Sequence, residues 1–133
     1  RMMGCDIHVF AVRKGSIELE QPEEVWDDRN YGAFGWLSGV RNYSDVPVSN
    51  LAHRGLPPEF KDHEEFQHLH SFTHFILQEL ANQDYSKLIT DHRPDVPREM
   101  SLSTFLGTYW AKGYNKLFWE YSPEDTIIIG YDS

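Results

Sequence analysis

The sequence has little cysteine and no long apolar segment, and both absences limit what the protein can be. Cys5 is the only cysteine in 133 residues, so the chain cannot form an intramolecular disulfide. No run of 18 apolar residues is present to cross a bilayer, and no signal peptide precedes the first predicted strand. We therefore expect a soluble, cytoplasmic protein with no membrane partner.

Positive charge is also scarce. Lysine and arginine number 12 against 21 aspartates and glutamates, which gives a formal net charge of −9. Proteins bind DNA or RNA polymers largely by neutralising phosphates, so this charge argues against a polymer partner. It is still compatible with a small anionic ligand, because a few converging arginines can form a local positive site.

Several catalytic and metal-binding motifs are missing. There is no His-Glu-x-x-His, no cysteine and histidine cluster, no glycine-rich phosphate loop and no Gly-x-Ser-x-Gly elbow. His70 and His74 have the four-residue spacing of a zinc pair on a helix, but the helix predicted here begins at Thr73 and leaves His70 outside it. We predict no metal site, and the cofactor stays unknown.

What the sequence does contain indicates one α+β domain over residues 1–133. Apolar residues make up 40% and aromatic residues 14%, enough for a globular core. We expect a small sheet with the first and last strands side by side, two main helices on one face, and a pocket on the other face beside the loops after Arg41.

The first predicted strand, residues 5–13, has two chemically different faces. Cys5, Ile7, Val9 and Ala11 alternate with polar Asp6 and His8, and side chains alternate across a strand. Cys5 is expected to be a small buried residue and not a nucleophile. Asp6 and His8 would then project from one face with Cβ atoms roughly 6–7 Å apart.

Periodicity and turn residues predict the other elements. The predictions are a strand at 16–20, a short helix near 33–40, a long loop at 41–58, a helix at 73–82 capped by Thr73, irregular chain at 84–100, a helix at 101–112 capped by Ser101 and ended by Gly113, a strand at 117–121, and a central strand at 126–131.

The opening Met3-Gly4-Cys5-Asp6-Ile7-His8 resembles the start of a family of small, largely uncharacterised proteins of bacteriophages, prophages and bacteria. Further similar stretches follow in order along the chain: 28–31 with Phe34, 39–42, 54–57, 70–73 leading into 79–80, and 128–132. The resemblance implies a shared polar set, which is Asp6, His8, Asp28, Arg29, Tyr31, Arg41, Arg54, His70 and Ser71. Relatives often carry a glutamate where Val12 stands, and its absence weakens any mechanism that needs a second acid beside Asp6.

The preferred functional hypothesis is a phage-type protein that binds and sequesters a nucleotide-derived ligand, such as an immune signal of the host. Arg29, Arg41 and Arg54 would hold phosphates, because guanidinium groups pair with them through two donors. Tyr31 and Trp36 would stack on a base. Asp6 would accept hydrogen bonds from ribose hydroxyls, and His8 would bind a polar edge.

Two other hypotheses stay open. The protein could be a phosphodiesterase-like hydrolase, with or without metal, in which His8 or His70 acts as general acid or base. It could instead be an inhibitor module that binds a basic protein surface and takes no small ligand. A homo-oligomer is compatible with all three.

Overall fold

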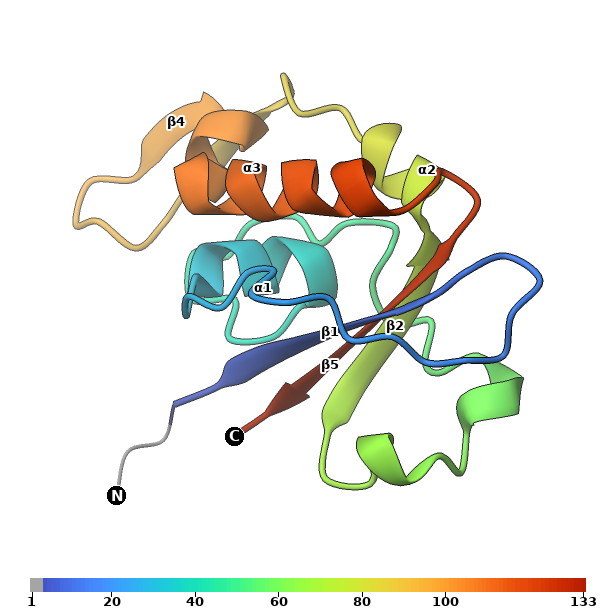
Figure 1. The fold of residues 1–133 in the computed structure, drawn as a ribbon. Coiled ribbons are helices and arrows are strands. Elements are labelled where there is room, and N and C mark those ends of the chain that lie inside the picture. Colours follow the sequence, from blue (N-terminus) through green and yellow to red (C-terminus); the bar gives the residue numbers. More distant parts are fainter. Residues whose placement is uncertain (1–3) are drawn as a thin grey trace.

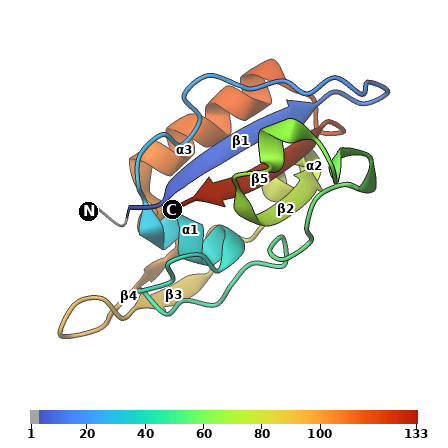
Figure 2. The same cartoon turned by 90° about the horizontal axis from the view of Figure 1, so that it is seen from below.

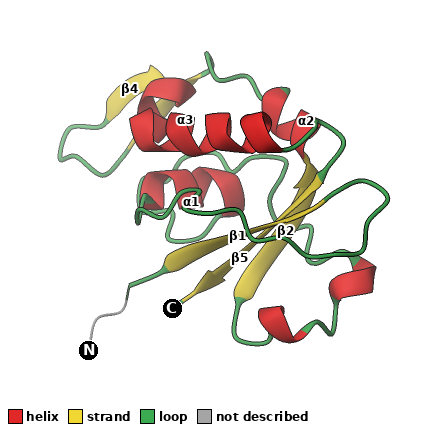
Figure 3. Cartoon of the chain, viewed as in Figure 1, coloured by secondary structure: helices red, strands yellow, loops and turns green. Residues whose placement is uncertain are grey.

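A computed structural model describes residues 4–133, so Met3 of the opening motif lies outside the described residues. Figures 1 and 3 show an α+β fold, as predicted. In chain order the elements are β1 (Asp6–Val12), α1 (Tyr31–Ser38), two 3₁₀ helices (Pro58–Phe60 and Glu64–Phe66), β2 (His70–Ile76), α2 (Leu77–Ala81), β3 (Leu88–Asp91), β4 (Arg98–Ser101), α3 (Leu102–Glu120) and β5 (Thr126–Asp132).

The main sheet has three antiparallel strands in the order β1-β5-β2. The first and last strands are therefore side by side, and the last strand is central, as the sequence predicts. Ile127, Ile128 and Ile129 of β5 are completely buried. A continuous β-branched run suits this position, because a central strand covered on both faces has no solvent side.

Two apolar cores cover the two faces of this sheet. Helices α1 and α3 lie over one face (Figure 1), where Ile127 and Ile129 join the larger core. On the other face Ile128 joins a smaller core with Phe10 and Phe66, whose rings meet edge to face at 5.0 Å. The face of β1 that carries Asp6 and His8 is thus covered beyond His8.

The predicted helix at 73–82 is wrong over its first half. Residues 70–76 form strand β2, and the helix that follows, α2, covers only Leu77–Ala81. Thr73 does not cap a helix: it pairs with Ile129 of β5, and its hydroxyl donates a hydrogen bond to the carbonyl of Leu51. Pairing with β5 overrides the local helical pattern.

Helix α3 begins as predicted but ends later. The Ser101 hydroxyl accepts a hydrogen bond from the amide of Thr104, which confirms the N-cap. The helix then continues past Gly113 to Glu120, so the predicted strand at 117–121 is wrong. A kink at Gly107, where φ is 83°, divides the helix.

The remaining predictions have mixed outcomes. The short helix near 33–40 exists as α1, and the loop predicted at 41–58 runs to Pro57, where the first 3₁₀ helix follows. The predicted strand at 16–20 is reduced to one bridge between Ala11 and Glu20. Within the supposedly irregular 84–100, β3 and β4 form a separate two-stranded sheet (Figure 2). Among residues 4–133, no helix is long and apolar enough to cross a membrane.

Gly113 lies inside α3, at a position where the neighbouring Trp26 leaves no room for a side chain. The Trp26 ring stacks on Trp110 at 4.2 Å, and its indole N–H donates to the Trp110 carbonyl at 3.0 Å. A Cβ at position 113 would overlap the Trp26 ring. The segment before α1 is therefore locked onto α3 through this close contact.

We expect Gly113→Ala to destabilise the protein by about 1–3 kcal/mol, because overpacking outweighs the helix propensity that alanine gains. Asn115→Ala, on the outer surface of the same helix, should leave stability unchanged or raise it slightly. Urea unfolding of both variants checks this. A stabilised Gly113→Ala protein would show that the indole can move away.

Candidate functional site

Most of the polar residues singled out from the sequence gather at one end of the three-stranded sheet. The antiparallel register places Asp6 of β1 opposite Asp132 of β5, and His70 of β2 opposite Tyr131. The starts of β1 and β2 thus flank the end of β5, as Figure 1 shows near the C-terminus. We call this region, with the loops on either side of α1, the sheet-end cluster.

His8 forms a close pair with Asp132 across the sheet. Its Nε2 lies 2.6 Å from the Asp132 carboxylate, and both side chains are about one-third exposed. Opposite His8 in the register stands Gly130, where a Cβ would come within 2.8 Å of the Phe72 ring. The carboxylate therefore orients an accessible imidazole, beside a glycine against which Phe72 packs closely.

Arg29 reaches the cluster from the segment before α1 and binds Asp6. Its Nε donates to one carboxylate oxygen at 2.8 Å, and Nη2 lies 3.5 Å from the other. This hydrogen bond lowers the pKa of Asp6, and the same pairing raises the pKa of Arg29. Gly4 permits the approach, because a Cβ there would overlap the guanidinium. The opening motif therefore has a structural use for its glycine.

Arg41 lies beside an aromatic pair on the other side of α1. Its guanidinium is 5.6 Å from the centre of the Tyr31 ring, and Nη1 donates to the Tyr43 hydroxyl at 3.3 Å. The Tyr31 hydroxyl accepts the amide hydrogen of Cys5 at 3.1 Å, which ties this group to β1. Tyr43 is 58% exposed, so one aromatic ring of the group is available to a ligand.

The thiol of Cys5, the residue before β1, interacts electrostatically with both arginines. Burial raises the pKa of the Cys5 thiol, and Arg41 and Arg29 both act to lower it. Cys5 is completely buried, as predicted. Its thiol is thus kept protonated, which fits a packing role.

His70 and Ser71 lie on the far side of β5. His70 Nδ1 is 2.8 Å from the Ser71 hydroxyl, and Nε2 is 2.9 Å from the hydroxyl of Ser133, next to Asp132. Ser71 has a φ of 58°, an uncommon conformation for a residue other than glycine, and it coincides with the register shift between His70 and Thr73. The bulge turns this pair toward the sheet end.

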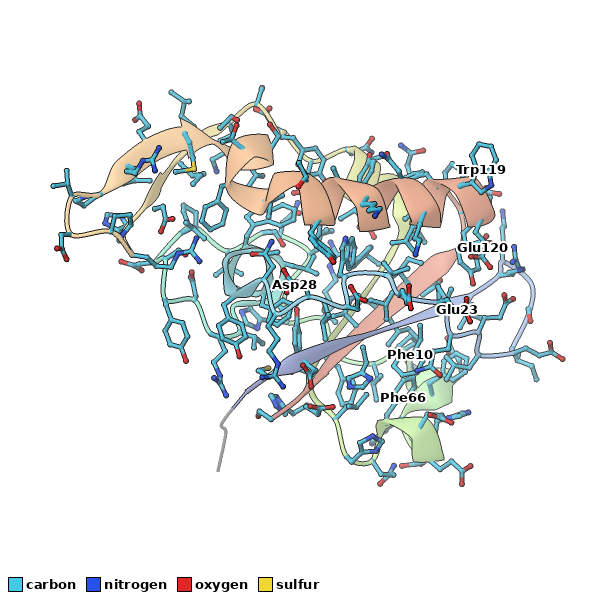
Figure 4. The ribbon with its side chains drawn as sticks, turned by 60° about the vertical axis from the view of Figure 1, so that its left-hand side comes forward. Phe10, Glu23, Asp28, Phe66, Trp119 and Glu120 are labelled. Carbon is cyan, nitrogen blue, oxygen red and sulfur yellow. The ribbon has the colours of Figure 1, made fainter. Side chains whose placement is uncertain are left out.

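Two predicted site residues make none of the contacts described above. Arg54 binds both carboxylate oxygens of Glu79 through Nη1, at 2.8 and 2.9 Å, beyond the outer edge of β2. Asp28, labelled in Figure 4, lines a hollow of about 10 Å³ that holds no more than a water molecule. Trp36, the expected base-stacking residue, is wrong for that role because it is buried against Trp110.

The comparisons with known proteins give no match. No family model matches the chain, no curated protein is significantly similar to it, and no solved structure matches it to a significant degree. The geometry of the sheet-end cluster is thus the basis for a functional argument.

The cluster lies open on the surface. The best-defined hollows of the described surface lie elsewhere, and their linings contain neither His8 nor the two arginines. Among residues 4–133, no group of three or more histidine, cysteine or acidic side chains is arranged to hold a metal ion. The cluster can instead offer guanidinium donors, an aromatic ring and two histidines to a ligand that lies across it.

The sequence analysis did not identify three residues of this site: Asp132, Ser133 and Tyr43. Asp132 and Ser133 follow the predicted central strand, and pairing the first and last strands in antiparallel register would have placed Asp132 opposite Asp6. Tyr43 follows Arg41 by two residues and gave no comparable signal.

We expect Arg29→Met to raise the pKa of Asp6 to at least its ordinary value of 3.8, since the lowering comes chiefly from the Arg29 hydrogen bond. A lowered carboxyl pKa stabilises the fold fully above the unfolded value of 3.8, and this stabilisation is lost as the pH falls through the lowered pKa of the folded state. The stability difference between wild type and variant should therefore shrink progressively as the pH falls below 3.8. Carboxyl ¹³C NMR titration measures the pKa. Arg98→Met, an exposed control in β4, should leave the pKa of Asp6 unchanged. If Arg29→Met also left this pKa unchanged, a donor other than Arg29 would be responsible for lowering it.

Proposed function

We propose that the protein binds a small phosphate-bearing ligand of nucleotide type at the sheet-end cluster and holds it intact. The observation that carries this proposal is the approach of Arg29 and Arg41, from separate segments, to the start of β1. Arg29 binds Asp6 there, and Arg41 lies beside Tyr31, whose hydroxyl accepts the amide hydrogen of Cys5. A binder of this kind would sequester its ligand, and a signalling nucleotide of a bacterial host is the class that we favour.

The chemistry of the group supports a nucleotide better than an apolar ligand. Guanidinium groups bind phosphate through charge-assisted hydrogen bonds, and aromatic side chains stack on bases. Arg29 and Arg41 supply the guanidinium groups, and the exposed ring of Tyr43 supplies the stacking surface. Tyr43 thus takes the role that the sequence analysis assigned to Trp36. Tyr31 links this group to β1.

The acidic and histidine residues complete the set. Asp6 pairs with Arg29 and Asp132 with His8, so each of these two carboxylates has a basic partner. Carboxylates also accept hydrogen bonds from ribose hydroxyls, the role that we assign to Asp6. Arg54 has no part in this site, because Glu79 holds it beyond β2.

We expect isothermal titration calorimetry to detect binding of a cyclic nucleotide or a cyclic ADP-ribose isomer. Loss of either guanidinium, in Arg29→Ala or Arg41→Ala, should weaken binding roughly 10- to 100-fold. Tyr43→Ala should weaken it about tenfold through lost stacking. Arg98→Ala and Tyr109→Ala are matched controls at exposed positions outside the cluster, and they should bind as the wild type does.

The fate of the ligand decides between sequestration and catalysis. After incubation and denaturation of the protein, mass spectrometry should recover the ligand unchanged. Failure to bind any member of the panel, or equal binding by the variants and the wild type, would refute the proposal.

One observation favours the hydrolase as a second candidate: the 2.6 Å contact between His8 and Asp132. A carboxylate that orients an imidazole is the arrangement of a general base. The imidazole could take a proton from water as the water attacks phosphorus and the ester bond breaks, and the imidazolium would then give that proton to the leaving oxygen. Recovery of cleaved ligand, abolished in His8→Ala and reduced in Asp132→Asn, would establish this function in place of sequestration. His70→Ala would show whether the second histidine takes part.

A further inference from the structure

The last turns of α3 expose a large aromatic side chain far from the sheet-end cluster. Trp26, Trp36 and Trp110 are buried, whereas Trp119 is 90% exposed. Figure 4 shows Trp119 at the end of α3, on the same side of the molecule as Glu120 and Glu23. Tryptophan is enriched at the centres of protein interfaces, where its burial contributes more than that of most residues.

Trp119 borders an open hollow of about 800 Å³ between α3 and the segment that precedes Trp26. Lys112, Lys116 and Trp119 follow one another at the i, i+4, i+7 spacing of a single helix face. Val25, Glu23 and Glu120 line the same hollow. We call this surface the Trp119 face.

Hydrogen bonds join the two segments that form the Trp119 face. Nζ of Lys116 lies 3.5 and 3.4 Å from the backbone carbonyls of Glu23 and Glu24, so α3 and the neighbouring segment are joined. Val25, the next residue along, is buried. A partner therefore meets a preformed surface and loses little entropy in ordering it.

The charges of the Trp119 face indicate which partner it fits. Two lysines and two glutamates line the hollow, so its lining is formally neutral in a protein of net charge −9. Over most of their surface two copies of this chain repel each other. At this face they do not, and each copy presents both signs of charge beside an apolar centre.

We propose that the Trp119 face is the interface between two copies of this chain, related by a two-fold axis. Such an axis across α3 sets the two helices antiparallel, so Lys112 at the start of this helix face in one copy meets Trp119 at its end in the other. Lys112 and Trp119 are seven residues apart, about 10 Å along the helix. Lys112 of each copy then lies over Trp119 and against Glu120 of the other, as a cation–π contact and an ion pair. Lys116, which this pairing places near the axis, has its Nζ held at the carbonyls of Glu23 and Glu24 of its own chain.

Sedimentation velocity of the full chain over a wide concentration range tests this interface. The wild type should dimerise reversibly, and Trp119→Ala should weaken the dimer about 30-fold or more, the effect of losing a central interface tryptophan. Leu88→Ala removes an exposed apolar side chain from β3 and should leave the dimer unchanged. A wild type that stays monomeric up to its solubility limit, or that pairs only with a basic protein, would overturn the proposal.

Charge reversal identifies the contact itself. Lys112→Glu gives the face an excess of negative charge and Glu120→Lys an excess of positive charge. In a homodimer of either variant, positions 112 and 120 of opposite copies carry the same charge. Each variant alone should therefore dimerise about tenfold more weakly than the wild type.

Mixed in equal amounts, the two variants should form a heterodimer. The two substituted side chains then have opposite charges and face each other across the interface, and at the second contact the unchanged Lys112 of one chain meets the unchanged Glu120 of the other. Native mass spectrometry resolves the three species when one chain carries ¹⁵N. A mixture without an excess of heterodimer would contradict the antiparallel pairing.

Discussion

Burial of β5 on both faces is the constraint on which the rest of the structure depends. Ile127 and Ile129 join the larger core beneath α1 and α3, and Ile128 joins the smaller core with Phe10. A strand in this position needs a neighbour on each side to satisfy its backbone groups, and β1 and β2 are those neighbours. Both run antiparallel to β5, so its end brings their starts together. The sheet-end cluster follows from that topology.

How much of this fold could be predicted depends on whether the signal was local. The alternation of β1, the β-branched run of β5 and the Ser101 cap are local, and each was predicted correctly. Thr73 illustrates the opposite case: its sequence neighbourhood has the pattern of a helix start, but the strand that pairs with it lies more than 50 residues away. Gly113 resembles a helix end only until Trp26, which is also far away in sequence, is seen to occupy the space.

The same distinction between local and long-range signals applies to the candidate site. Asp6 and His8 share a face because they are two residues apart on a strand, which the sequence shows directly. Their partners, Arg29 and Asp132, come from other segments, and only the strand register could have indicated Asp132 in advance. Arg54 could not have been excluded from sequence, since nothing local shows that Glu79, on a different element, holds its guanidinium.

The two proposed surfaces lie at opposite ends of the same strand. The chain leaves α3 at Glu120 and enters β5 at Thr126, so the Trp119 face is near the start of β5 and the cluster is at its end. Six residue steps of a strand separate these ends by about 20 Å. Two copies joined through Trp119 would therefore leave both clusters open to solvent, and ligand binding requires no dissociation. Coupling between the two surfaces along β5 is disfavoured, because its residues between Thr126 and Asp132 are buried and have little freedom to transmit it.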